Sequence, residues 1–187
     1  MKYSNNRENY FEGFLPRNVM GLLSVAVLLM ASACMGFAQE NDGVNFRGGI
    51  GVIPVTGVAA NGAVNLNVVR GVPPAGPWRI TSLEAEVNSN GRIKVEGRGL
   101  LLASGSGIGT NAGQSVHASL FCGPAATATE HDSTVAGVAL ADDGDFRIND
   151  VLSPPPPAIC DNPVLLIRNV GGIWFAAGIP EHEDDRK

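Results

Sequence analysis

The stretch ALADDGDFRI at residues 139–148 places Asp142, Asp143 and Asp145 around Gly144. A three-residue hairpin loop commonly combines a type I turn with a glycine in the left-handed region, and Asp142-Asp143-Gly144 fits such a loop. In this register positions 141/145, 140/146, 139/147 and 138/148 face each other, and the apolar members share one face. The stretch therefore predicts a β-hairpin whose aspartates accept hydrogen bonds from backbone N–H groups of the turn.

A second stretch, LEAEVNSNGRIKVE at residues 83–96, follows the same rule around Ser89-Asn90-Gly91. The predicted facing pairs are 87/93, 86/94 and 85/95, which give one apolar face and one charged face with Glu86 opposite Lys94. Asn90 and Gly91, like Asp142, Asp143 and Gly144, are therefore assigned to a structural turn.

A metal site is the alternative interpretation of the aspartate cluster. A calcium loop needs oxygen ligands at several fixed offsets and a closing bidentate acid. After Asp143 and Asp145 the next alternate position is Arg147, a cation. Paired carboxylates for glycoside hydrolysis would need a substrate cleft between them, which one tight turn does not supply. We therefore expect no metal at this turn.

The rest of the chain alternates or runs apolar in pieces of strand length. Segments 63–69 and 114–122 alternate, PVLLIR and GIWFAAGI are continuous apolar runs, and 24 glycines supply turns. About eight short antiparallel strands without a helical period predict an all-β fold, an Ig-like β-sandwich.

The segment at residues 139–157, ALADDGDFRINDVLSPPPP, resembles a pattern of carboxypeptidase-regulatory-like and related Ig-like β-sandwich domains of exported bacterial proteins. The shared features are the aspartate–glycine turn, the aromatic residue after it and an exit through proline. The resemblance implies an accessory, structural or binding module, and it transfers no functional residue.

The N-terminus has the features of a secretory signal. Lys2, Arg7 and Arg17 precede an uncharged apolar run, and Gly36-Phe37-Ala38 ends it with small residues. We expect a signal peptide at 1–38, a flexible segment at 39–50, a sandwich domain at 51–180 and an acidic disordered tail at 181–187. The predicted location is secreted or periplasmic. Membrane attachment would follow only if the segment were retained or Cys34 lipidated.

Charge and cysteine usage agree with export. The formal net charge is −5, and the basic residues are scattered, so nucleic acid is not an expected partner. Cys122 and Cys160 remain after signal removal and predict a disulfide in an oxidising compartment. Two buried thiols are the alternative.

The longest glycine-rich stretch, SGSGIGTNAG at 104–113, is the candidate ligand loop, with Ser104, Ser106, Thr110 and Asn111 as its polar side chains. Its GIGTNA resembles a dinucleotide fingerprint, but a strand pattern follows where the pyrophosphate would need a helix N-terminus. We therefore expect no cofactor, and a protein or carbohydrate as the partner of the loop.

Three interpretations of function remain from the sequence, one of them an inhibitor or chaperone-like partner that offers an edge strand. The favoured one is an exported, non-enzymatic β-sandwich with a binding or structural role in the cell envelope or extracellular space. The alternative is a small secreted hydrolase or metalloprotein using His117, His131 and Asp132. These three side chains must converge in space for that alternative to work.

Overall fold

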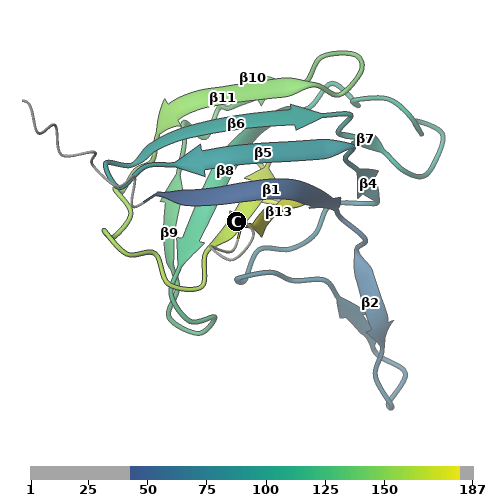
Figure 1. Ribbon diagram of the computed structural model, residues 1–187. Helices are drawn as coiled ribbons and strands as arrows, with labels where there is room; N and C mark the ends of the chain where they lie inside the picture. The colour runs from purple at the N-terminus through teal and green to yellow at the C-terminus, as the bar shows by residue number, and fades with distance from the viewer. Residues whose placement is uncertain (1–42, 182–187) are drawn as a thin grey trace, which may run out of the picture. The chain divides into compact units, whose positions relative to one another are not determined.

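The computed structural model describes residues 43–181, and this part of the chain contains β-strands and no helix (Figure 1). The predicted all-β class is therefore confirmed. The strands are β1 (Val44–Gly51), β2 (Val55–Val58), β3 (Val64–Leu66), β4 (Trp78–Arg79), β5 (Ser82–Val87), β6 (Arg92–Arg98), β7 (Leu101–Leu102), β8 (Ser115–Cys122), β9 (Thr129–Asp132), β10 (Val138–Ala139), β11 (Phe146–Val151), β12 (Val164–Arg168) and β13 (Trp174–Pro180).

The main sheet is antiparallel and curls as a half-barrel, in the order β10-β8-β12-β13-β1-β5-β6-β11. Strand β9 pairs with the edge of β8 that β10 also uses. In Figure 1 the layer of β1, β5, β6 and β11 lies in front of β8 and β13. An Ig-like sandwich has two separate sheets, whereas here both layers belong to one hydrogen-bonded sheet, continuous through β1 and β13.

One apolar core fills the inside of the curl. Its largest fully buried side chains come from both layers, among them Phe46 and Leu83 from one and Leu120 and Leu165 from the other. Trp78 stacks on Phe175 with ring centroids 4.4 Å apart, which adds directional contact to area burial. The core therefore holds the two layers of the curled sheet together, and the sheet positions the loops that connect its strands.

The hairpin predicted around Gly91 is confirmed residue for residue. Strands β5 and β6 pair Val87 with Ile93, and the ladder continues through the two predicted pairs beyond them. Asn90 Oδ1 accepts a hydrogen bond from Arg92 N at 3.0 Å, and Gly91 has φ of +81°. The Asn-Gly turn thus fixes this register, because the short hairpin loop needs a residue in the left-handed region and glycine adopts it without strain.

The hairpin predicted around Gly144 is wrong beyond the turn itself. Ala141 N donates to Asp145 O, but β10 pairs with β8 and β11 pairs with β6, so the facing pairs 140/146, 139/147 and 138/148 are not formed. The backbone of β10 instead forms its hydrogen bonds with the edge of β8, and the backbone of β11 forms its hydrogen bonds with the edge of β6. The turn therefore joins the two ends of the curled sheet.

The same two ends also meet between β9 and the residues after β11. Asp132 and Ser153 form an isolated antiparallel bridge with both N–H groups donating. Thr134 N donates to Asp150 Oδ2 at 2.7 Å, and this bond lowers the pKa of the Asp150 carboxyl. These hydrogen bonds join the two edges of the curled sheet on its open side.

Residues 44–50, expected in a flexible segment at 39–50, instead belong to β1, so that prediction is wrong there. Phe46 anchors this strand in the core, and its glycines had hidden the strand pattern. Glu181, expected in the disordered tail, donates its N–H to Asn45 O and pairs with Arg47 at 3.0 Å. The predicted signal at 1–38, with Cys34, and the tail at 182–187 lie outside the described residues.

Candidate functional site

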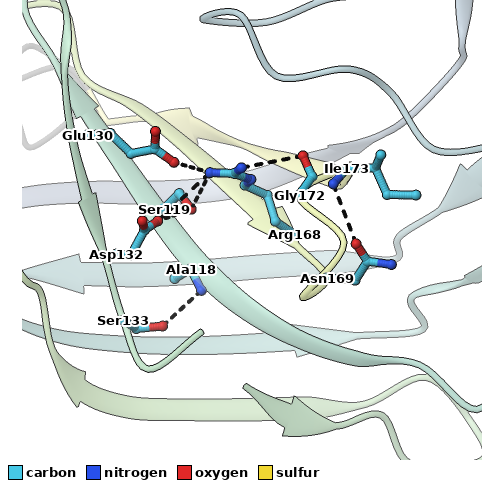
Figure 2. Close-up of polar contacts among 9 residues, drawn as sticks. All are labelled: Ala118, Ser119, Glu130, Asp132, Ser133, Arg168, Asn169, Gly172 and Ile173. Carbon is cyan, nitrogen blue, oxygen red and sulfur yellow. Dashed lines mark hydrogen bonds and ion pairs between the residues drawn. The ribbon is translucent and has the colours of Figure 1, made fainter. Parts of the chain in front are cut away.

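A charged network lies where β8, β9 and β12 run side by side (Figure 2). Arg168 ends β12 and extends its guanidinium toward Glu130 and Asp132 on β9, with an Nη1–Oδ1 distance of 3.8 Å to Asp132. The same nitrogen donates to Ser119 Oγ at 3.1 Å, and Ser119 Oγ donates to Asp132. Nη2 donates to Gly172 O at 3.3 Å.

This network joins three neighbouring strands and a turn through one side chain. The Arg168 guanidinium is largely buried, so its attraction to the carboxylates is screened less than at a free surface. Ser119 is completely buried, which keeps a substrate away from its hydroxyl. The arrangement therefore holds strands together and does not present a nucleophile.

His117 lies beside this network, opposite Arg168 in the β8–β12 ladder. Its ring is buried, and Nδ1 has no hydrogen-bond partner within residues 43–181. Burial lowers the pKa of the His117 imidazole; Arg168 acts in the same direction, while Asp132 and Glu130 oppose it. The folded protein consequently favours the neutral ring.

His131 points to the other face of the sheet. It pairs with Leu120 in the β8–β9 ladder, whereas Asp132 pairs with Ser119, and successive residues of a strand point to opposite faces. The His131 ring is fixed by Thr129 Oγ1 and Pro154 O, each at 2.9 Å. His117, His131 and Asp132 therefore do not converge, and the geometry gives no support to a hydrolase or metal site built from them.

The buried, neutral His117 predicts a loss of stability in mild acid. Because its pKa is lower in the folded state than in the unfolded chain, the unfolded state takes up more protons as pH falls below about 6.5, and the free energy of unfolding decreases. Urea unfolding of the wild type and His117→Gln between pH 7.5 and 5.5 measures this. We expect a smaller pH dependence in His117→Gln; equal slopes would contradict the assignment.

The predicted ligand loop is partly used by the fold. Asn111 Nδ2 donates to Leu140 O at 3.1 Å and to Ala141 O at 3.0 Å, which holds the turn after β10. Thr110 Oγ1 donates to Gly107 O within the loop. Ser104 and Ser106 are exposed. The four polar side chains thus do not act together, because Asn111 and Thr110 are committed to backbone groups.

The aspartate turn is likewise built into the fold. Asp143 Oδ1 accepts from Asp145 N at 3.1 Å, and Asp145 Oδ1 accepts from Gly99 N at 3.0 Å. Gly144 has φ of +83°, and Leu100 N donates to its carbonyl at 3.0 Å. Within the described residues, no group of three or more His, Cys, Asp and Glu side chains is placed to hold a metal ion.

Gly144→Ala is expected to lower the free energy of unfolding by about 3 kcal/mol, from left-handed backbone strain together with crowding. A Cβ at this position would lie 2.6 Å from the backbone N and O of Leu100, so relaxation would have to move the β6–β7 connection. Asp143→Asn is the matched control, since asparagine accepts the same hydrogen bond. Chemical denaturation compares the two; a similar small loss for both would contradict the prediction.

The predicted disulfide is present: Cys122 and Cys160 are bonded, with their Cα atoms 4.9 Å apart. It joins the end of β8 to the segment that follows the four prolines at 154–157. Gly123 N donates to Asp161 O beside it. The covalent link therefore fixes the end of the polar network's central strand.

An exposed apolar face lies on the hairpin of β2 and β3, which projects from the main sheet (Figure 1). Val55 pairs with Leu66 and Val58 pairs with Val64, with a bulge between the two pairs. Because paired residues point to the same face, and Val64 and Leu66 are two positions apart, the bulge puts all four side chains on one face. They are 44–66% exposed. The opposite face carries Gly57 and Asn65.

This hairpin is firmly attached at its base and carries no charge. Asn67 N donates to Pro54 O at 2.9 Å, and the buried Trp174 donates its indole N–H to Asn67 O at 3.0 Å. Residues 48–69 contain no Asp, Glu, Lys or Arg, with Arg47 and Arg70 at the two ends. That uncharged run is the sequence feature that could have indicated an exposed apolar surface. Alternation alone predicted a strand at 63–69 and did not show that it would stay uncovered.

The outer face of β1, β5 and β6 holds a polar groove of about 390 Å³. Glu84 and Glu96 lie directly opposite each other there, and Arg47 and Arg147 flank them on the neighbouring strands. Arg147 reaches Glu96 at 3.5 Å. These opposite charges compensate one another along the row and leave a polar surface without strong charge of one sign.

Aromatic side chains are not available to a ligand in this part of the chain: every Phe and Trp within 43–181 is buried. Ligand pockets for small molecules are lined mainly by apolar and aromatic groups. The described surface therefore offers a sugar no aromatic platform, whereas the β2–β3 hairpin offers an aliphatic one.

No known protein family, curated protein or solved structure matches this chain. Among residues 43–181 there is no helix long and apolar enough to cross a membrane.

Proposed function

We propose that this chain is an exported, non-enzymatic all-β protein with a binding or structural role in the cell envelope or extracellular space, and that the β2–β3 hairpin is its binding element. The observation that carries the proposal is the uncharged apolar face of Val55, Val58, Val64 and Leu66, held exposed on a rigid base. Exposed apolar patches of this kind commonly mark interaction sites.

Other features support the same proposal. The curled sheet serves as a scaffold in the way an Ig-like β-sandwich does in accessory domains, with the connecting segments carrying the contacts. The disulfide fits an oxidising compartment, and the N-terminal segment fits export. Ser119 and His117 are buried, which argues against hydrolysis by these two groups. The lack of an exposed aromatic among residues 43–181 favours a protein partner over a carbohydrate.

Export and the role of the hairpin are tested together in cells. The full chain is produced with a C-terminal reporter that is active only in an oxidising compartment. Val58→Glu is compared with Val170→Glu, the matched control, which adds the same charge in the turn before β13. We expect reporter activity for all three chains and reduced retention on the envelope for Val58→Glu alone. An inactive reporter, or equal retention of all three chains, would contradict the proposal.

A further inference from the structure

The β2–β3 hairpin lacks a covering layer. It forms its own two-stranded sheet, and no third strand from the described residues joins it. A sheet buries its apolar face against another element, and an isolated two-stranded hairpin is at best marginally stable in water. The apolar face of Val55, Val58, Val64 and Leu66 is therefore left uncovered by the described residues, and it is available to a partner.

A membrane surface fits this face poorly. Interfacial segments combine apolar side chains with Trp, Tyr, Lys or Arg, and residues 48–69 contain none of these. The net charge of the whole chain is −5, which disfavours approach to anionic lipids. The chemistry of the hairpin thus favours a protein surface that is itself uncharged and aliphatic.

The face can pack on the same face of a second copy. It consists of two cross-strand aliphatic pairs, Val55–Leu66 and Val58–Val64, of similar size. A two-fold axis that lies between the two faces, parallel to them and perpendicular to the strands, places the first pair of one copy over the second pair of another, which is the self-complementary arrangement of an isologous interface. Because residues 48–69 carry no charge, two copies meet there without burying an ion or opposing like charges.

The position of the hairpin supports the same occupant. It projects from the sheet, so two hairpins can meet while the acidic bodies stay apart (Figure 1). Its base is fixed by the Trp174–Asn67 and Asn67–Pro54 hydrogen bonds, which limits the freedom lost on association. We infer that this chain self-associates through the β2–β3 hairpin, with the apolar face of one copy packed on the same face of a second copy. This inference rests on the proposed role of the hairpin as the binding element and names its partner.

The small size of the face predicts a weak dimer that depends on concentration, as interfaces below the standard size are. The full chain is expressed in a host that can export it, and the protein is purified without further processing. Sedimentation equilibrium then measures its mass over a dilution series. We expect the mass to rise from one chain toward two with concentration. Val58→Glu should stay at one chain, and Val170→Glu, whose side chain is 73% exposed against 66% at Val58, should behave as the wild type.

Cysteine cross-linking tests the geometry of the contact. Val58→Cys places a thiol on the apolar face, and Gly57→Cys places one on the opposite face, where an added Cβ meets no atom within 4 Å. We expect oxidation to link Val58→Cys into dimers and to leave Gly57→Cys mostly unlinked. Equal linking of both variants would overturn face-to-face packing.

Three further outcomes would overturn the inference: a wild type that stays monomeric at all concentrations, a Val58→Glu variant that dimerises as the wild type does, or a dimer that dissociates in high salt as a charged interface would. Because no side chain of the hairpin belongs to the main core, Val58→Glu should keep the melting temperature of the wild type. A monomeric wild type whose envelope retention still falls in Val58→Glu would overturn self-association and leave the proposed function standing.

Discussion

Phe146→Ala is expected to lower the free energy of unfolding by about 4 kcal/mol, the cost of emptying a core site of this size. The Phe146 ring is buried and lies against Gly97, its partner in the β6–β11 ladder. A Cβ built on Gly97 would overlap the ring, so the ring occupies the space that a side chain at 97 would otherwise fill. Gly97, which lies beneath the ring, has no side chain that could move into the cavity.

Urea or guanidinium unfolding of the full chain measures this loss, and Phe146→Leu is the matched control because it keeps most of the apolar volume. We expect Phe146→Leu to lose clearly less than Phe146→Ala. A loss below about 1 kcal/mol for Phe146→Ala would show that the site collapses or is hydrated, contrary to the packing described, since a filled aromatic core site costs several times more.

Removing the disulfide, by the paired substitutions Cys122→Ala and Cys160→Ala, is expected to cost about 4 kcal/mol in the chain-entropy description of a bridge of this length. The two residues are 38 positions apart, so the bond closes a long loop in the unfolded chain. That loop contains β9, β10 and β11, including both fastenings of the open side of the curl. The reduced chain must order these strands without a covalent restraint.

The measurement compares unfolding of the oxidised wild type, the wild type in reductant and the double variant. We expect the reduced wild type and the double variant to unfold at similar, lower denaturant concentrations. An unchanged midpoint in both would mean that the bridge restrains an unfolded state that is already compact there.

The parts of the fold that could be predicted from sequence are those decided by neighbours along the chain. The β5–β6 register follows from one Asn-Gly turn and period-two alternation, and it is as predicted. The 138–148 hairpin has equally good local chemistry, yet its arms separate because the edges of β8 and β6 compete for them. Which edge is free depends on pairings between distant segments, and alternation carries no information about that.

The candidate site shows the same division. The Cys122–Cys160 bond could be predicted because removal of the predicted signal at 1–38 would leave one pair of cysteines. The grouping of His117, His131 and Asp132 failed on strand parity, since positions 131 and 132 point to opposite faces. The hairpin face was missed because the bulge that aligns Val55 with Val58 changes the parity within β2, and exposure is decided by the absence of a covering layer.

The placement of β1 between β5 and β13 has a kinetic consequence. The first strand of the main sheet takes the last strand as one of its two neighbours, so the sheet cannot be completed until residues 174–180 have been synthesised. Pairings between distant segments slow the folding of small domains, because the chain entropy of loop closure is lost before the contacts form. The β5–β6 hairpin can form early, while β1 keeps an open edge until the C-terminal strand arrives. Late completion of the sheet would suit the proposed export, because a chain that crosses a membrane through a narrow pore must still be unfolded when it does so.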